Sequence, residues 1–161
     1  MNLPTNDDLY LDANFLIAYF ISDHGDHKNS IKLLAYLLIK QDTLHFSPLT
    51  LDELMMGVHR ELNTAKNKKG NNKGFSVAHF YPELKVALEL LLNNSQFKLR
   101  QFENNLNNSC ILALENVKNF TLRPRDAFHV SYMQDWLINK IISKDSGFDR
   151  LKGINIKRIN F

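Results

Sequence analysis

Four carboxylate side chains occupy positions at which a chain can build a metal site. Asp12 and Asp145 each end an apolar, strand-like run, and Glu53 and Asp126 each lie in the first turns of a predicted helix. Ligands of open α/β sheets bind at the edge formed by the carboxyl ends of the strands, and the helix dipole favours an ionised carboxylate near a helix N-terminus. We therefore expect anionic oxygens on all four elements, converging at one edge of a sheet.

Convergence of four acids in a partly dehydrated pocket implies a bound cation. Repulsion would cost roughly 4 kcal/mol for each close pair at an intermediate dielectric, and a divalent cation removes that cost. No His or Cys lies near any two of the acids with a spacing typical of zinc sites. An all-oxygen ligand set suits Mg²⁺ or Mn²⁺. The sequence therefore predicts a magnesium or manganese site.

The elements that must position these acids follow from the hydrophobic periodicity. Predicted strands alternate with predicted helices, and this order favours a parallel sheet covered on both faces. The expected fold class is α/β, with three layers and a central, mostly parallel sheet of four to five strands flanked by helices. Strands are expected near 9–12, 44–47, 140–145 and 154–159, a strand or loop over 97–102, and helices over 13–20, 31–38, 48–62, 77–94, 104–119 and 124–139.

Composition and charge bound the organisation of the chain. Its 161 residues are 44% hydrophobic and 23% charged, which suits one core and a single domain over residues 1–161. The net charge of +3 is concentrated in basic stretches at 66–74 and 140–161. Such stretches either follow a phosphate backbone or form a solvated surface. Residues 63–76 break the helical pattern, and we expect a mobile basic loop there.

Two further observations concern the cellular setting. The first residues lack a basic region followed by an apolar core, and the longest apolar run, 33–39, is too short to span a bilayer. We therefore expect a soluble, cytoplasmic protein with no membrane partner. The single cysteine, Cys110, cannot form an internal disulfide and is predicted to be a buried thiol in a helix.

Each acid also has a purely structural interpretation. Asp12 can cap the helix that follows it, and Thr50 with Glu53 matches a capping box. Ser47 before Pro48 is the better helix start, however, and this leaves Glu53 free one turn into the helix.

Asp126 and Asp145 have ordinary alternatives as well. Asp126 fits the composition of a first helical turn, and Asp145 before Ser-Gly fits a turn. One cation accounts for four acids that otherwise need four separate explanations. The helical histidines His59 and His129 are able to contact RNA or act as acid and base, but packing at a surface or interface is favoured for both.

Five short motifs occur in the order and spacing of a known family. They are Leu11–Asn14 with its strand-end aspartate, Ser47–Leu54 with its acidic helix, Arg125–Val130, the hydroxyl-x-Asp turn Ser143–Phe148, and the closing strand Gly153–Ile156. Together they resemble the PIN domain, a nuclease fold of about this length with a central parallel sheet. The resemblance covers nearly the whole chain, although Ser143 stands where the family usually has Thr and the segment 63–76 has no counterpart in the family core.

The resemblance implies a ribonuclease that depends on Mg²⁺ or Mn²⁺ and cuts phosphodiester bonds with a metal-activated water. By this resemblance Asp12 and Asp126 are the leading metal ligands, Glu53 and Asp145 complete the site directly or through water, Asn14 and Ser143 orient the water or a carboxylate, and Asp149 is a further supporting acid. The substrate it implies is RNA, expected to be single-stranded. Free PIN nucleases often resemble the toxin of a toxin–antitoxin pair, which adds an inhibitory antitoxin protein and a homodimer to the expected partners.

Other functions remain open at this point. The same fold can serve as a non-catalytic RNA-binding or protein-interaction module, which requires that the acids fail to bind metal. A haloacid-dehalogenase-like phosphatase also begins with a strand-end aspartate, but Asn14 occupies the place where that class needs a second aspartate. DNA remains an alternative substrate, because only contacts with the 2′-hydroxyl or the strand shape distinguish the two backbones.

Overall fold

The structure is a computed structural model that describes residues 6–68 and 74–161. A five-stranded sheet forms its centre, with the strand order β3-β2-β1-β4-β5 and every neighbouring pair parallel. This confirms the predicted α/β class and the parallel sheet. The strands are β1 Asp8–Leu11, β2 Thr43–Phe46, β3 Phe97–Leu99, β4 Lys140–Ile142 and β5 Lys157–Ile159.

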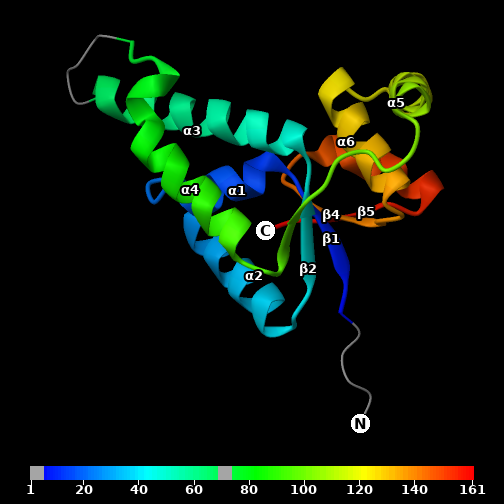
Figure 1. Ribbon diagram of the computed structural model, residues 1–161, viewed down its shortest axis with the longest axis horizontal. Helices are drawn as coiled ribbons and strands as arrows, with labels where there is room; N and C mark the ends of the chain where they lie inside the picture. Colours follow the sequence, from blue (N-terminus) through cyan, green and yellow to red (C-terminus); the bar gives the residue numbers. More distant parts are fainter. Residues whose placement is uncertain (1–5, 69–73) are drawn as a thin grey trace.

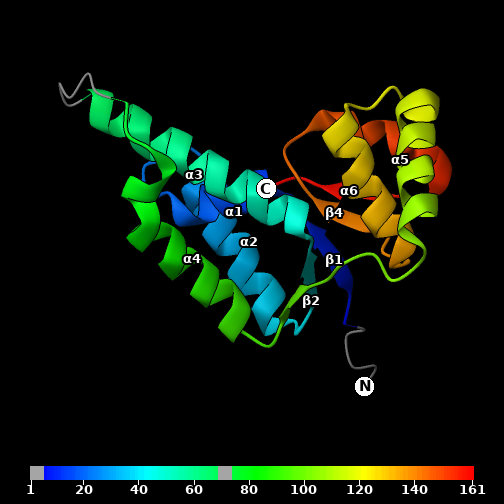
Figure 2. The same ribbon diagram turned by 45° about the horizontal axis from the view of Figure 1, so that its top comes forward.

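Helices cover both faces of the sheet, so the molecule has three layers (Figures 1 and 2). Side chains of a strand alternate between faces, and β1 follows this rule: Leu9 and Leu11 pack with the layer of α1 to α4, and Tyr10 packs with the layer of α5 and α6. Both faces of β1 are therefore buried, as in parallel sheets generally. The helices are α1 Ala13–Phe20, α2 His27–Ile39, α3 Pro48–Lys68, α4 Tyr81–Asn93, α5 Leu106–Phe120 and α6 Pro124–Asp135, with 3₁₀ helices η1 Val77–Phe80 and η2 Ser146–Ile154.

The predicted loop at 63–76 begins too early. Helix α3 continues to Lys68, because the residues from 63 to 68 include no Pro or Gly that would end a helix. Two side chains of α3 also contact the backbone of Phe75. Asn63 Oδ1 accepts a hydrogen bond from the Phe75 amide at 3.2 Å, and the His59 ring lies 2.7 Å from the Phe75 carbonyl oxygen. Residues 69–73 of the predicted loop lie outside the described residues, and 74–76 follow without regular secondary structure.

Other differences concern the ends of elements and one side chain. Strand β4 ends at Ile142, so Ser143 follows the strand directly and Asp145 lies in the turn beyond it. Helix α6 stops at Asp135, shortly before Leu137 takes a positive φ of 57°. The prediction of a buried thiol was wrong, because Cys110 lies on the exposed side of α5. Within the described ranges, no helix has the length and apolar character needed to cross a membrane.

Candidate active site

Asp12 lies between β1 and α1, at the carboxyl edge of the sheet. Its backbone amide donates to the Ile142 carbonyl at 3.2 Å, which ties this edge of β1 to β4. The side chain is only 7% exposed and makes no capping hydrogen bond to α1, so the capping interpretation does not account for it. Burial is the main influence that raises the pKa of the Asp12 carboxyl, and a hydrogen bond from Ser143 opposes it. A buried carboxylate of this kind gains from a cation.

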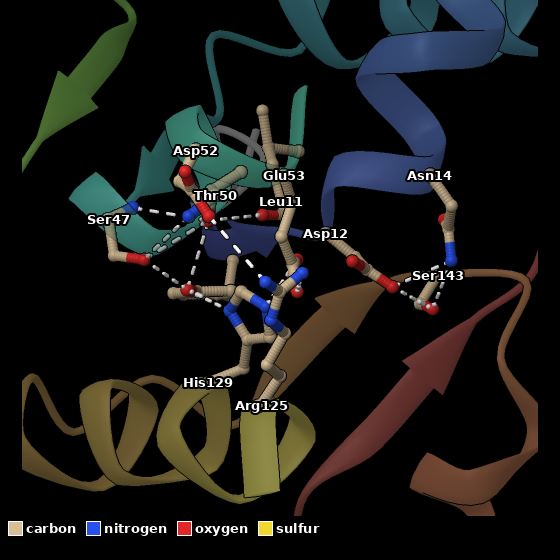
Figure 3. A network of polar contacts seen from close by, with 11 residues as sticks. Leu11, Asp12, Asn14, Ser47, Thr50, Asp52, Glu53, Arg125, His129 and Ser143 are labelled. Carbon is tan, nitrogen blue, oxygen red and sulfur yellow. Dashed lines mark hydrogen bonds and ion pairs between the residues drawn. The ribbon is translucent and has the colours of Figure 1, made fainter. Parts of the chain in front are cut away.

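Asn14 and Ser143 hold the Asp12 carboxylate from one side (Figure 3). The Asn14 amide donates to Asp12 Oδ2 at 2.7 Å, and the Ser143 hydroxyl donates to the same oxygen. Asn14 also lies 3.0 Å from Ser143 Oγ, which in turn accepts from the Asp145 amide at 2.9 Å. The positions of these side chains agree with the predicted supporting role, which stays a prediction.

Glu53 is presented one turn into α3, as the sequence indicated. Ser47 and Thr50 form a reciprocal cap: the Thr50 amide donates to Ser47 Oγ at 3.2 Å and the Ser47 amide lies 3.3 Å from Thr50 Oγ1. The prediction that Ser47 starts this helix is confirmed. Glu53 is thereby released from the capping box and reaches α6, where its Oε2 lies 2.8 Å from His129 Nε2 and its Oε1 lies 3.7 Å from Arg125.

Asp126 and Asp145 complete the acidic set. Asp126 lies half-buried in the first turn of α6, after Pro124. Burial raises the pKa of its carboxyl, and the negative charge of Asp145 adds to this effect. Asp145 is held in its turn by the Gly147 amide, which donates to Oδ1 at 2.7 Å. Repulsion between these two acids is the situation that a hard divalent cation relieves.

All four predicted acids line one cavity of about 710 Å³. The four acids therefore surround one space, although the metal-like cluster among the described residues consists of Asp12, Glu53 and His129, without Asp126 and Asp145. Their joint role as metal ligands stays a prediction, and carboxylate oxygens are donors that suit a hard cation such as Mg²⁺ or Mn²⁺. Three basic side chains line the same cavity, so that anionic and cationic groups surround one space. The lining includes Asp12, Asn14, Glu53, Asp126 and Asp145 together with Arg60, Arg123 and Arg125.

His129 is a site residue that sequence analysis did not predict. It was expected to pack at a surface or interface, but its side chain is only 1% exposed and lies beside the acids. Ligand atoms of Asp12, Glu53 and His129 all lie within 4.8 Å of one another. The spacing offered a signal, because His129 lies three residues after Asp126 and so shares its side of the helix. Figure 3 shows its ring directed toward Glu53.

Asp149 does not join the other acids. It belongs to η2, and Arg158 of β5 binds it with two contacts, from Nε to Oδ1 at 2.9 Å and from Nη2 to Oδ2 at 2.8 Å. Asp149 is not among the residues that line the acidic cavity. Asp149 therefore lies apart from the residues that line this cavity, and the supporting role that the resemblance implies for it stays a prediction.

The family model named PIN domain matches residues 9–154, and the chain belongs to this family.

Among solved structures, VapC20 of Mycobacterium tuberculosis, described as a Sarcin-Ricin loop cleaving toxin, aligns with a TM-score of 0.63 at 15% identity over 88% of this chain and 92% of that one. VapBC2 of Rickettsia felis, bound to a DNA fragment from their promoter, aligns with a TM-score of 0.58 at 17% identity over 95% and 98% of the two chains. FitAcB of Neisseria gonorrhoeae aligns with a TM-score of 0.58 at 14% identity over 94% and 96%. At these identities the likeness concerns the fold. A search of curated proteins finds no significant match.

Proposed function

We propose that the protein is an endoribonuclease that depends on a divalent cation and hydrolyses RNA phosphodiester bonds. The observation that carries the proposal is the meeting of four acids, from four segments of the chain, around one cavity. Membership of the PIN domain family supports it, as does the description of VapC20 as a Sarcin-Ricin loop cleaving toxin.

The donor chemistry of the cavity assigns the metal-binding role. Asp12, Glu53, Asp126 and Asp145 would hold Mg²⁺ or Mn²⁺, whose charge activates a water and neutralises charge that develops on the phosphate. Asn14 and Ser143 fix the orientation of the Asp12 carboxylate through the two hydrogen bonds to Oδ2. These two hydrogen bonds leave the other carboxylate oxygen, Oδ1, for the cation.

The basic side chains of the cavity would bind the phosphates of the substrate. Arg60 on α3 and Arg125 on α6 are exposed, and Arg123 immediately precedes α6. Since all three arginines line the acidic cavity, phosphates of an RNA strand can contact their guanidinium groups while the reacting phosphate lies beside the acids. Arginine contacts of this kind fix the position of the backbone and do not read sequence.

The proposal extends to the partners. We propose that the chain is the toxin of a toxin–antitoxin pair and acts in the cytoplasm as a homodimer inhibited by an antitoxin protein. The support is the fold shared with VapC20, which is described as a toxin, and with VapBC2. Light scattering coupled to size exclusion tests the dimer, and a mass of one chain at working concentration would refute it.

Cleavage of end-labelled single-stranded RNA tests the central proposal. We expect cutting that requires Mg²⁺ or Mn²⁺, stops with EDTA, and falls about 100-fold or more in Asp126→Asn because a metal ligand is lost. Asp23→Asn, the same exchange at an exposed position away from the cavity, is the matched control and should cut normally. An active control with an equally active Asp126→Asn would contradict the assignment of the site. Absence of cutting by the wild type at every metal concentration would favour the non-catalytic RNA-binding or interaction module.

A further inference from the structure

A buried network of hydrogen-bonded side chains leads from the sheet to Glu53. Tyr10 of β1 is fully buried, and its hydroxyl lies 2.6 Å from His129 Nδ1, 2.8 Å from Ser47 Oγ and 3.1 Å from Thr50 Oγ1. The other ring nitrogen of His129 lies 2.8 Å from Glu53 Oε2. One hydroxyl group therefore joins β1, the start of α3, and α6.

The direction of these hydrogen bonds follows from what each group can donate. An ionised carboxylate only accepts, so Nε2 of His129 carries the hydrogen that is shared with Glu53. Burial raises the pKa of Tyr10 far above its usual range, and the hydroxyl keeps its proton. Nδ1 of His129 shares a hydrogen bond with this hydroxyl, and the tyrosine oxygen is also paired with the hydroxyl of Ser47. All polar atoms of the network are then paired, as buried groups require.

This direction also decides what His129 does in the site. Although its Nε2 is close enough to Asp12 and Glu53 to join a metal ligand set, a nitrogen that carries a hydrogen has no lone pair to give to a metal. Its second nitrogen is occupied by Tyr10. The ring is therefore placed to orient a ligand and not to act as one, which is a common arrangement around metal sites.

We propose that Tyr10 and His129 form a positioning relay that fixes the Glu53 carboxylate in the metal site through the Nε2–H group of His129. The inference rests on the proposed function and adds two residues that act through Glu53. Each end of the relay is close in sequence to an acid: Tyr10 precedes Asp12 by two residues, and His129 follows Asp126 by three. The relay thus sets the relative position of segments that carry three of the four acids.

Two substitutions at His129 separate the donor from the rest of the ring. The amide nitrogen of His129→Gln reaches roughly the place of Nε2 and still donates to Glu53, whereas His129→Asn ends near Nδ1 and does not reach it. We expect Mn²⁺ to bind His129→Asn about 10- to 100-fold more weakly than the wild type, and His129→Gln to retain most of the affinity. Equal affinity of wild type and His129→Asn, or equal loss in both variants, would overturn the relay.

Tyr10→Phe removes the hydroxyl and keeps the ring in the core, and Tyr132→Phe makes the same exchange on α6 outside the relay. Tyr10→Phe should weaken Mn²⁺ binding and lower kcat at limiting Mn²⁺ while the KM for RNA stays unchanged, and Tyr132→Phe should do neither. If Tyr10 had a merely structural role, Tyr10→Phe would lower the unfolding temperature without this split between kcat and KM. An unchanged Mn²⁺ affinity in Tyr10→Phe would overturn the relay.

The nitrogen NMR spectrum of the imidazole gives a readout that does not depend on activity. In the metal-free protein we expect Nε2 of His129 to carry a hydrogen, which it shares with Glu53. A ring with its proton on Nδ1 alone would overturn the relay. Failure of the wild type to bind Mn²⁺ at all would overturn both the relay and the proposed function, whereas normal Mn²⁺-dependent cleavage by His129→Asn would overturn the relay alone.

Discussion

A methyl group added at Gly57 would collide with α1 beside the active-site cavity. Gly57 lies in α3, one turn after Glu53, and is buried against Ile17 of α1. A Cβ atom at this position would lie 2.7 Å from Ile17 Cγ1 and closer still to Ile17 Cδ1. Because Ile17 and Gly57 both line the cavity, this contact sets the distance between the helix that follows Asp12 and the helix that carries Glu53.

Two opposing terms give the expected magnitude for Gly57→Ala. Replacing a helical glycine by alanine stabilises a helix by about 1 kcal/mol, and forcing an extra methyl group into a packed contact costs about 1–3 kcal/mol. Both clashing atoms belong to the end of the Ile17 side chain, so the new methyl group requires that this largely buried side chain move to another rotamer. We therefore expect a net destabilisation of up to about 2 kcal/mol. The displaced α3 should also weaken Mn²⁺ binding through Glu53.

Urea unfolding of metal-free protein measures the first effect and Mn²⁺ titration the second. The control is the pair Ile17→Val and Gly57→Ala/Ile17→Val. Valine lacks Cδ1 and costs about 0.5–1.5 kcal/mol by itself, but it removes the closest contact with the new methyl group. The double variant should therefore be more stable than the sum of the single variants predicts. Stabilisation by Gly57→Ala alone, or strict additivity in the double variant, would refute the reasoning.

Three further predictions concern the acids, the start of α3 and the substrate. Because burial and then Asp145 raise the pKa of Asp126, the folded metal-free protein binds more protons than the unfolded chain between the ordinary and the raised pKa. Its stability should fall as pH rises through that window. Asp126→Asn should reduce this fall in urea titrations at a series of pH values, and an unchanged slope would contradict the assignment. Ser47→Ala removes the helix cap and should cost about 0.5–2 kcal/mol in urea unfolding; a loss within experimental error would show that the cap is dispensable. Arg123→Ala should weaken RNA binding equally for different sequences and lower the salt slope by about 1, as measured by fluorescence anisotropy, and a change limited to one sequence would refute a phosphate contact.

The parallel sheet and the position of the four acids around one cavity were predictable because they follow from local patterns. The buried run before Asp12 has the length of a strand, and a strand-end acid followed by a helix places its side chain at the ligand-binding edge. Glu53 was predictable for a similar reason, since Ser47 and Pro48 mark the helix start. The positions of Asp12 and Glu53 could therefore be predicted without knowledge of tertiary contacts.

The errors arose where tertiary contacts decide the outcome. The polar segment after Asn63 was expected to form a loop, but hydrogen bonds between α3 and Phe75 accompany a helix that continues to Lys68. Asp149 was taken as a supporting acid from the family resemblance, and its contact with Arg158 of β5 is likewise not visible in the sequence. Both outcomes depend on partners that are distant in sequence or lie across a turn.

His129 illustrates the same limit inside the site. A single histidine on a helix forms no repeating sequence pattern from which its role could be predicted. The role of His129 depends on Tyr10 and Glu53, which are 119 and 76 residues away along the chain. Only the three-residue spacing from Asp126 is visible in the sequence. That spacing places the two side chains on one side of a helix but does not show that the ring is buried.

The buried hydrogen-bonded network also explains how a metal-free fold can hold like charges together. Asp12 and Asp126 have raised pKa values, so ionising them in the folded state costs free energy. Hydrogen bonds among Tyr10, Ser47, Thr50 and His129 join the segments that hold these acids. The acids are therefore positioned in the metal-free fold. A cation bound there as proposed would relieve their repulsion, so Mn²⁺ should raise the unfolding temperature without changing the secondary structure.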